Sequence, residues 1–350
     1  MYKLKALDTE ITNRCNAACP LCPRTGTFSG VAQFMHNTGS MDVRPEIFDE
    51  ILTSKAGSSI KKVTYCGNYG DPMVHPKALE IFQKCARHGV TTQKVDTNGA
   101  MRNTDWWAKV GSIPGFEVNF AIDGLEDTNH LYRVNTNFKK ILENAQAFID
   151  AGGIAHWVFI VFEHNQHQVE EARALSKKMG FKRFANKETV RAFSPESGSS
   201  KLEGRKYKKS KKSDVTKTDF ALPEEEKYKP EMVRIGYKEK PVSCLAQEKS
   251  QLFLTCDENI IPCCHTQEFF HIKRYDKTRT DKKYKQYEID SFYKKHGMIT
   301  DLNIYTFDEI YDSYAEAFPY LTREWEDRSL PRCNKKCGSN HRNVSRYTEN

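Results

Sequence analysis

The chain has 350 residues, a formal net charge of +8 and 11 cysteines, and 38% of its residues are hydrophobic. This length exceeds one ordinary domain and fits two. The mild charge gives little support to a dedicated nucleic-acid binder, and no apolar run approaches the about eighteen residues of a membrane-spanning helix. Residues 1–5 do not resemble a secretory signal, so we expect a cytosolic chain, in which clustered cysteines are more often metal ligands than disulfides.

The first chemical feature along the chain is a run of three cysteines, Cys15, Cys19 and Cys22. Their spacing folds a short loop around one point, where three thiolates can hold three irons of a 4Fe-4S cube and leave the fourth iron open. A structural zinc site is the alternative, but it normally has a fourth Cys or His close by, and the next histidine is His36. The motif therefore predicts a redox enzyme.

The next 180 residues or so alternate between β-rich and helical runs. Helices are expected over residues 77–88 and 169–179, and strands near residues 5–12, 62–66, 92–96, 116–122, 156–162 and 182–193. Alternation of this kind predicts an α/β fold with a parallel sheet and helices outside it. In barrels built from such units, chemistry gathers at the carboxyl ends of the strands.

Three of the expected strands end in turns with polar residues. The strand over 62–66 leads into a Gly-rich stretch, residues 67–72, and the next two strands lead into residues 97–99 and Asp123. An ordinary turn is one explanation of the first stretch, with glycine supplying a positive φ and Pro72 starting the exit. A cofactor-binding turn is the other.

The three-cysteine motif and the order of these segments over residues 1–195 resemble the radical S-adenosylmethionine (SAM) superfamily. In that family the open iron binds the amino and carboxylate groups of SAM, and one-electron reduction cleaves SAM to methionine and a 5'-deoxyadenosyl radical. The resemblance implies a partial (β/α)6 TIM-like barrel over residues 1–195. It also implies a cytoplasmic location, because such clusters are oxygen-sensitive, and an electron donor such as flavodoxin or ferredoxin.

The resemblance assigns the 4Fe-4S cluster that binds SAM to Cys15, Cys19 and Cys22. A Gly-Gly-Glu-Pro stretch of the family meets the SAM ammonium, and residues 69–72 stand in its place with Asp71 instead of the longer Glu. On the same grounds the predicted SAM-binding residues are Leu21, Gly67, Gly70, Asp71, Thr97, Asp123, Arg133 and Asn165.

The composition changes abruptly at about residue 194. Residues 201–212 carry a dense run of lysines, and low hydrophobicity with like charge does not repay the entropy of ordering. We therefore expect residues 196–240 to be a basic, mobile linker. A basic arm that binds nucleic acid is the alternative, but a solvated connector is the favoured interpretation.

Beyond the linker the cysteines return. Residues 244–264 predict a β-hairpin, with a turn at residues 257–259 that lacks the usual glycine, and a helix is expected over 306–313. This order resembles the auxiliary-cluster domains called SPASM and twitch, which implies a small α+β domain over residues 241–350.

That second resemblance assigns four ligands to an auxiliary 4Fe-4S cube without an open iron: Cys244, Cys263, Cys333 and Cys337. Cys264 is an alternative to Cys263. The remaining cysteines are interpreted as a hairpin residue, Cys256, and as core residues, Cys66 and Cys85. A zinc site made of four thiolates is the alternative for the auxiliary group.

The predicted function is a radical SAM enzyme that abstracts a hydrogen from a peptide or small-molecule substrate. Fold alone does not determine the substrate, and no segment resembles the winged peptide-recognition domain of many peptide modifiers. An RNA-modifying enzyme that uses the basic arm is one alternative. A non-enzymatic electron-transfer or zinc-stabilised binding protein is another, but it requires four protein ligands at each site and the first motif has three.

Overall fold

The computed structural model describes residues 3–22, 24, 39–66, 68–187, 244–267, 293, 297–315 and the backbone of 347–348. The strands are β1 (Ala6–Thr9), β2 (Lys62–Tyr65), β3 (Thr92–Thr97), β4 (Phe116–Ala121), β5 (Ile154–Ile160), β6 (Arg183–Lys187), β7 (Gln251–Leu254), β8 (Ile260–Ile261) and β9 (Tyr347–Thr348). The helices are α2 (Glu46–Thr53), α3 (Ala78–Arg87), α4 (Thr104–Gly111), α5 (Asn129–Tyr132), α6 (Phe138–Asp150), α7 (Val169–Met179) and α9 (Leu245–Glu248).

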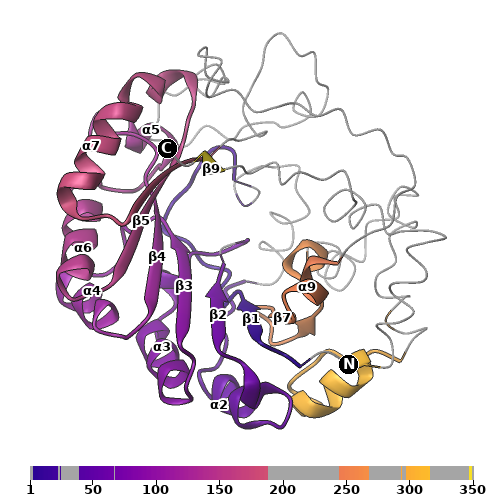
Figure 1. Cartoon of the computed structure of the whole chain (residues 1–350). Coiled ribbons are helices and arrows are strands. Elements are labelled where there is room, and N and C mark those ends of the chain that lie inside the picture. Colours follow the sequence, from indigo (N-terminus) through magenta and orange to yellow (C-terminus); the bar gives the residue numbers. More distant parts are fainter. Residues whose placement is uncertain are drawn as a thin grey trace, which may run out of the picture.

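These strands form one open sheet in the order β8-β7-β1-β2-β3-β4-β5-β6-β9. The strands β1 to β6 are neighbours in chain order and all run parallel. Figure 1 shows the sheet as a curved wall with α3, α4, α6 and α7 on its outer side. The predicted partial (β/α)6 barrel is therefore confirmed, although the last strand ends at Lys187 and its predicted continuation to residue 193 lies outside the described residues.

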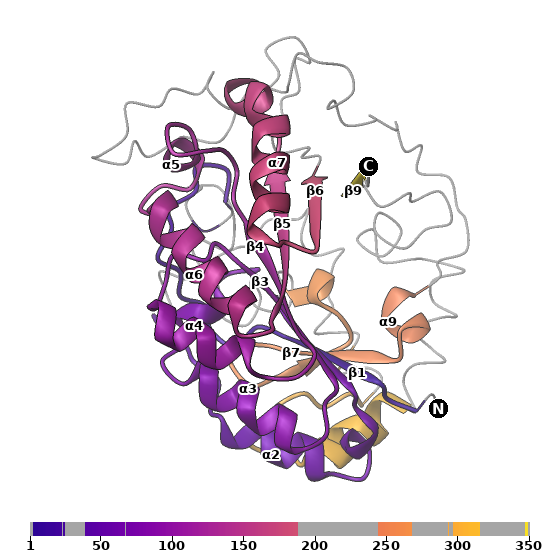
Figure 2. The same cartoon turned by 60° about the vertical axis from the view of Figure 1, so that its left-hand side comes forward.

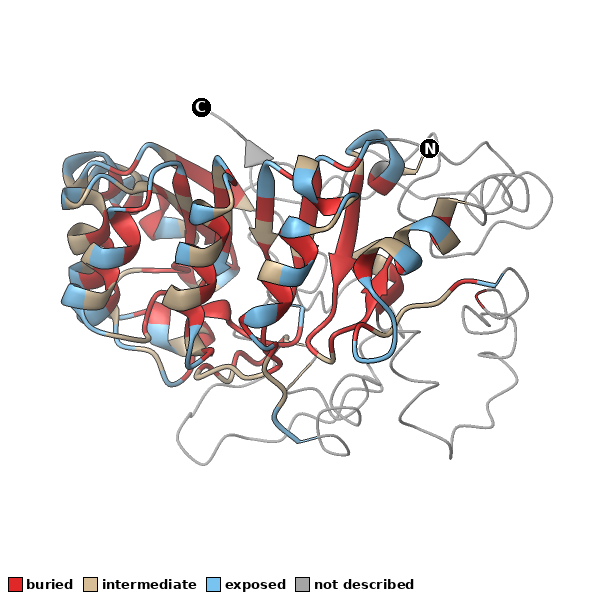
Figure 3. Cartoon of the chain, turned by 90° about the horizontal axis from the view of Figure 1, so that it is seen from below, coloured by how far each residue is buried: buried red, intermediate tan, exposed pale blue. Residues whose placement is uncertain are grey.

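The outer helices bury one face each against the sheet. In α3 the buried residues Ala78, Ile81, Phe82 and Cys85 recur at helical spacing, and Figure 3 shows the same division into buried inner and exposed outer faces around the barrel. Between the helices and the sheet the core is aromatic, and Phe82 meets Phe116 with ring centroids 4.8 Å apart. Cys85 is thus a core residue, as predicted.

The predicted hairpin over residues 244–264 is present, but it does not start a sheet of its own. Its first strand, β7, lies beside β1 (Figure 2) and pairs with it in parallel, so that Leu252 lies opposite Leu7. The second strand, β8, pairs antiparallel with β7. β1 would otherwise be an edge strand with unpaired backbone groups. The hairpin therefore extends the barrel sheet across the predicted domain boundary at residue 241.

The hairpin turn lacks glycine because another contact stabilises the left-handed conformation. Glu258 has φ +59°, and its carboxylate binds Arg44, with Nε lying 3.0 Å from Oε2 and the Arg44 amide donating to Oε1 at 2.8 Å. A helix over residues 307–315 docks on the same side of the barrel, since Asp308 accepts from the amide of Ala56 at 2.8 Å.

The linker over 196–240 and the pair Cys333 and Cys337 also lie outside the described residues. The helices of the described part are each too short or too polar to cross a lipid bilayer.

Candidate functional site

Loops that follow neighbouring strands meet at one edge of the sheet, where parallel strands have their carboxyl ends. The loop after β2 lies against the chain that leads into the three-cysteine motif, because the amide of Asp71 donates to the carbonyl of Arg14 at 2.8 Å. The loop after β3 reaches the same place, and Asn98 Nδ2 donates to Asn16 Oδ1 at 2.9 Å. The structure thus brings the cysteine motif next to two of the predicted strand-end turns.

The cysteine loop, residues 15–22, is held by backbone hydrogen bonds. The amide of Cys22 donates to the carbonyl of Cys19 at 3.0 Å, and the amide of Ala18 donates to the carbonyl of Val134 at the same distance. Cys19 is buried, while Cys15 and Cys22 are half-buried. The segment after α5 therefore anchors the backbone of the cysteine loop.

Asp71 joins the loops after β2 and β3. Its Oδ1 accepts from the amide of Met73 at 3.0 Å and from the hydroxyl of Thr97 at 2.8 Å. Its Oδ2 accepts from the amide and the side chain of Asn98 at 2.8 and 2.6 Å. Burial raises the pKa of Asp71, and these hydrogen bonds oppose the rise. The donors occupy about all four acceptor positions of the carboxylate.

Gly70 lies where the turn after β2 packs against residues 12–14, the backbone that leads into the cysteine loop. A Cβ at this position would lie 2.0 Å from the carbonyl oxygen of Thr12 and 2.8 Å from that of Arg14. The φ of Gly70 is not in the left-handed region, so the turn needs glycine for the close approach of two backbones and not for a positive φ. Gly67, the other predicted glycine, lies outside the described residues.

A buried ion pair joins the end of β4 to the cysteine loop. Arg133 Nε donates to Asp123 Oδ2 at 2.6 Å, and Arg133 Nη1 donates to Cys19 Sγ at 3.7 Å. The other carboxylate oxygen accepts from the amide of Ile160 at 2.6 Å. Burial disfavours the charged guanidinium, but the carboxylate of Asp123 outweighs this effect and raises the pKa of Arg133. A fixed positive charge therefore lies beside the thiol of Cys19.

Two further predicted residues hold the site together. Asn165 Nδ2 donates to the carbonyls of Asp123 and Ile160 at 2.9 and 3.0 Å, and Asn165 Oδ1 accepts from the amide of Phe162 at 2.7 Å. Leu21 packs against Phe162 in a small apolar cluster beside the main core. Asn165 thus ties the end of β5 to the end of β4, and Leu21 anchors the cysteine loop.

A comparison with protein families agrees with this geometry. The family model described as the radical SAM superfamily matches residues 9–175, which contain the cysteine loop and the loops after β2, β3, β4 and β5. Residues 9–175 belong to the radical SAM superfamily. The radical SAM domain thus runs from β1 into α7 and takes in the part of the sheet whose order the sequence predicted.

Two curated proteins are similar to parts of this radical SAM domain. The tungsten-containing aldehyde ferredoxin oxidoreductase cofactor-modifying protein of Pyrococcus furiosus is 26% identical over 122 residues, which cover 35% of this chain and 32% of that protein. A probable GTP 3',8-cyclase of Methanothermobacter marburgensis is 26% identical over 152 residues, covering 43% and 45%. The chain thus matches less than half of the length of either relative.

Among solved structures, Streptococcus suis SuiB bound to S-adenosylmethionine aligns with a TM-score of 0.50 and 12% identity, over 83% of this chain and 66% of SuiB. SuiB bound to the precursor peptide SuiA aligns with the same TM-score and 14% identity, over 77% and 61%. At these identities the likeness supports the fold, the partial barrel of a radical SAM domain.

The thiols of the radical SAM domain fit an iron-sulfur cube. Burial raises the pKa of Cys15 to about 12 and raises that of Cys19, where Arg133 partly offsets it, so a metal must displace the thiol protons. Asn98 Nδ2 lies 3.8 Å from Cys15 Sγ and Arg133 lies near Cys19, and N–H groups so placed can hydrogen-bond to ligand sulfurs. Among the described residues, no three His, Cys, Asp or Glu side chains lie close enough together to bind the same metal ion. A cube does not require this, because each thiolate binds a different iron.

The C-terminal cysteines lie around the added hairpin. Cys244 immediately precedes α9, and Cys263 and Cys264 follow β8; all three are half-buried, whereas Cys256 is buried in the hairpin turn. Cys264 packs against the main core. The other two predicted ligands of this group lie outside the described residues, so the auxiliary site stays a prediction.

Sequence reasoning missed Glu10, a fully buried residue just after β1. Its Oε1 accepts from the amides of Tyr69 and Gly70, the latter at 3.0 Å, and its Oε2 accepts from Gln267 Nε2 at 2.6 Å. The available signal was alternation: Glu10 follows Asp8 by two residues at the carboxyl end of β1, where the extended chain places both side chains on one face of the sheet. Nothing local in the sequence indicates what they meet on that face.

Glu10 should make the stability of the metal-free protein depend on pH. Burial raises its pKa to about 7 from an ordinary 4.5, and its three donors only partly offset the rise. Because the folded pKa exceeds the unfolded one, the folded state retains a proton that the unfolded state releases, and stability falls as pH rises from about 4.5 to about 7. Between pH 5 and pH 8 the free energy of unfolding of the wild type should fall by about 2.5 kcal/mol more than that of Glu10→Gln. Urea titrations of both proteins at these pH values measure the difference, and equal pH slopes would contradict the prediction.

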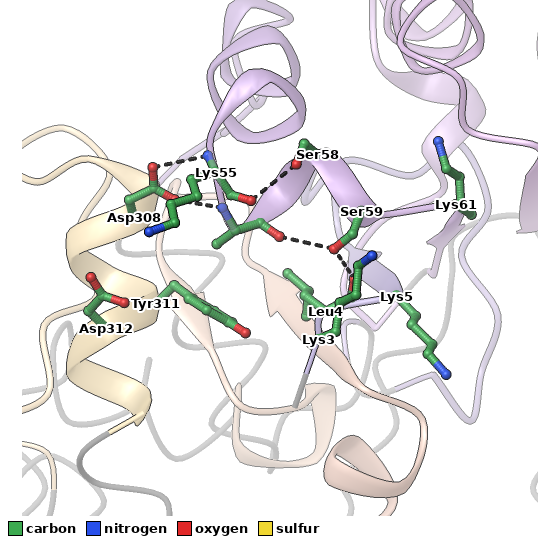
Figure 4. A pocket seen from close by; sticks show the side chains of 11 residues that line it. Lys3, Leu4, Lys5, Lys55, Ser58, Ser59, Lys61, Asp308, Tyr311 and Asp312 are labelled. Carbon is green, nitrogen blue, oxygen red and sulfur yellow. Dashed lines mark hydrogen bonds between the residues drawn. The ribbon is translucent and has the colours of Figure 1, made fainter. Parts of the chain in front are cut away.

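A hollow of about 830 Å³ lies at the opposite, amino end of β1 and β2. Its wall includes Lys5, Lys61 and Asp308, but in Figure 4 the ammonium groups of Lys5 and Lys61 point in different directions. Lys61 Nζ donates to the carbonyl of Gly89 at 3.2 Å. The hollow therefore offers no convergent set of charges, and the candidate site is the carboxyl edge of the sheet.

Proposed function

We propose that this chain is a radical SAM enzyme, which reductively cleaves SAM at a 4Fe-4S cluster held by Cys15, Cys19 and Cys22 and uses the 5'-deoxyadenosyl radical to abstract a hydrogen from a substrate. The observation that carries the proposal is the cysteine loop at the carboxyl edge, with Asn98 and Arg133 directed at two of its sulfurs. When bound, the cluster and SAM supply the radical chemistry, and the protein supplies orientation and exclusion of water.

The chain's own residues divide the positioning between them. Arg133, fixed by Asp123, places a positive charge beside Cys19 and so favours its thiolate. The turn at residues 68–71 lies against the backbone just before Cys15, where backbone carbonyls of the turn and the carboxylate of Asp71 can accept from the amino group of SAM. A new contact from Asp71 to that ammonium requires one of its present donors, Thr97 or Asn98, to move. We assign Asn165 the role of holding the ends of β4 and β5 together through the carbonyls of Asp123 and Ile160.

For the C-terminal part we propose a twitch or SPASM-like auxiliary 4Fe-4S cluster with Cys244, Cys263, Cys333 and Cys337 as ligands. The confirmed hairpin supports it, because it returns the chain to Cys263 after β8. A closed four-thiolate site leaves no open iron, so its role would be electron transfer, substrate binding or structure. The one-electron reduction requires an external donor, such as flavodoxin or ferredoxin. The oxygen sensitivity of the clusters favours a cytoplasmic location.

For the substrate we propose a peptide. The fold shared with SuiB, which was solved with the peptide SuiA, supports this class, as does the polar inner face of the sheet. On that face Glu117 lies 3.7 Å from Lys94 and 3.6 Å from His156, on three adjacent strands. These groups alternate with the residues buried against the helices, so they face the concave side, where an extended polar chain can bind. The basic arm that would favour RNA lies outside the described residues.

An anaerobic reconstitution tests the proposal. The purified chain is loaded with iron and sulfide, its iron and zinc are counted, and SAM and dithionite are added before 5'-deoxyadenosine is assayed by mass spectrometry. We expect about eight irons per chain, as two cubes require, and deoxyadenosine and methionine in equal amounts. Zinc in place of iron, or the absence of deoxyadenosine from an iron-loaded chain, would overturn the proposal.

A further inference from the structure

Glu10 connects three segments that are far apart in the sequence. It follows β1 and precedes the cysteine loop, and its Oε1 accepts from the consecutive amides of Tyr69 and Gly70 in the turn after β2. Two consecutive amides aimed at one oxygen form a concave anion site in the backbone. The side chain is fully buried, so water cannot replace it as the partner of these two amides. The conformation of the turn therefore depends on an acceptor oxygen in this position.

The second oxygen of Glu10 extends the connection to the C-terminal half of the chain. Gln267, which is buried and lies three residues after Cys264, donates its Nε2 to Glu10 Oε2 at 2.6 Å. The carbonyl oxygen of the same Gln267 amide accepts from Asn68 Nδ2 at 2.8 Å. Hydrogen bonds therefore join Tyr69 to Glu10, Glu10 to Gln267 and Gln267 to Asn68, and the peptide bond between Asn68 and Tyr69 closes the ring.

This ring has a defined polarity. In the structure both oxygens of Glu10 accept, so Gln267 donates with its nitrogen and accepts from Asn68 with its oxygen. Any change at Gln267 or at Glu10 therefore alters the partner of Asn68 and of the neighbouring turn amides. The turn also contacts the chain that leads into the cysteine loop, because the amide of Asp71 donates to the carbonyl of Arg14, the residue before Cys15.

We propose that Glu10 is a positioning residue that couples the segment carrying Cys263 and Cys264 to the turn that faces SAM and, through that turn, to the cysteine loop. The assignment of this turn to the SAM site rests on the proposed function, whereas the coupling itself does not. Its physical content is that the conformation of residues 68–71 depends on a contact from residue 267, two hundred residues away in sequence and in the other half of the chain.

The chain offers a matched control for each half of this contact. Asp8 lies in β1, two residues before Glu10, and accepts from Gln251 Nε2 at 2.9 Å, so it forms a second carboxylate-to-glutamine pair between the same two halves. The control pair lies within the paired strands β1 and β7, and Asp8 also has a hydrogen bond with Thr64 on β2, ahead of the turn. Glu10→Gln is therefore compared with Asp8→Asn, and Gln267→Ala with Gln251→Ala.

The first measurement is amide hydrogen exchange of the metal-free proteins, which needs no activity. In Glu10→Gln and in Gln267→Ala, peptides covering residues 66–72 should exchange about tenfold faster than in the wild type, because the turn loses a fixed partner. In the two control variants exchange there should stay within about twofold. If Gln267→Ala leaves residues 66–72 at the rate of Gln251→Ala, the coupling is wrong. Should Glu10→Gln fail to fold, the Gln267→Ala comparison decides alone.

The second measurement is SAM affinity of the iron-loaded proteins by equilibrium dialysis. Glu10→Gln and Gln267→Ala should bind SAM about tenfold more weakly than their controls, which corresponds to about 1.4 kcal/mol. Equal affinity in variants and controls would remove the link between the coupling and SAM. A wild-type chain that binds no SAM would instead overturn the proposed function, while the exchange comparison still decides the coupling.

Discussion

Replacing Cys15, Cys19 and Cys22 together by alanine should abolish the formation of 5'-deoxyadenosine and lower the iron content from about eight to about four per chain. The reason is that thiolates are the ligands of such a cube, and the cysteine loop supplies three of them on one stretch beside the N–H groups of Asn98 and Arg133. Anaerobic reconstitution with iron counting and mass spectrometry of the SAM products measures both quantities.

The matched control is Cys85→Ala. Cys85 is a buried thiol in α3, where its sulfur accepts from the hydroxyl of Tyr65 at 3.2 Å and has no contact with the candidate site. This variant should keep about eight irons and make deoxyadenosine within about twofold of the wild type. Deoxyadenosine that persists in the triple variant would show that the chemistry does not depend on the cysteine loop.

Breaking the buried ion pair between Asp123 and Arg133 should cost about 3–5 kcal/mol of unfolding free energy, because it leaves one charge without its partner away from water. The side chain of Asp123 is fully buried and that of Arg133 is 15% exposed, and Arg133 Nε lies 2.6 Å from Asp123 Oδ2. Asp123→Asn keeps the shape of the side chain and removes its charge, and Arg133→Met removes the guanidinium. Urea unfolding of the metal-free proteins measures the loss.

The control for charge removal is Glu170→Gln, which breaks the exposed pair with Arg173 on α7. An exposed pair is screened by water, so this change should cost less than about 1 kcal/mol. If Asp123→Asn cost no more than Glu170→Gln, the buried pair would not hold the end of β4 in place. In the iron-loaded protein, Arg133→Met should also shift the absorption of the cluster, since Cys19 loses a hydrogen-bond donor.

Much of the architecture could be predicted because its signals are local. The helix over residues 169–179 and the order of β1 to β6 follow from periodicity and alternation within short windows. The predictions for Cys85 as a core residue and for the hairpin after residue 244 are confirmed on the same basis. The register and the partner of β7 depend on which strand leaves an open edge, and a short window of sequence carries no such information.

The candidate site divides in the same way. Asp123 and Thr97 could be selected because polar residues after buried strands gather at one edge of a parallel sheet. That both oxygens of Asp71 are occupied, that Gly70 serves a close approach, and that Asn98 reaches Cys15 depend on how loops from different strands pack.

The sequence by itself determined that three cysteines lie within eight residues, and this spacing is the basis of the ligand set proposed for the cysteine loop. It also determined the alternation that builds the open barrel. Only the tertiary structure decided the environment of those thiols: the charge of Arg133 beside Cys19, and the ring that joins Glu10 to Gln267. The physical reason is that hydrogen bonds and buried charges act over a few ångströms in space, and the folded chain alone brings residues 10, 69 and 267 within that range.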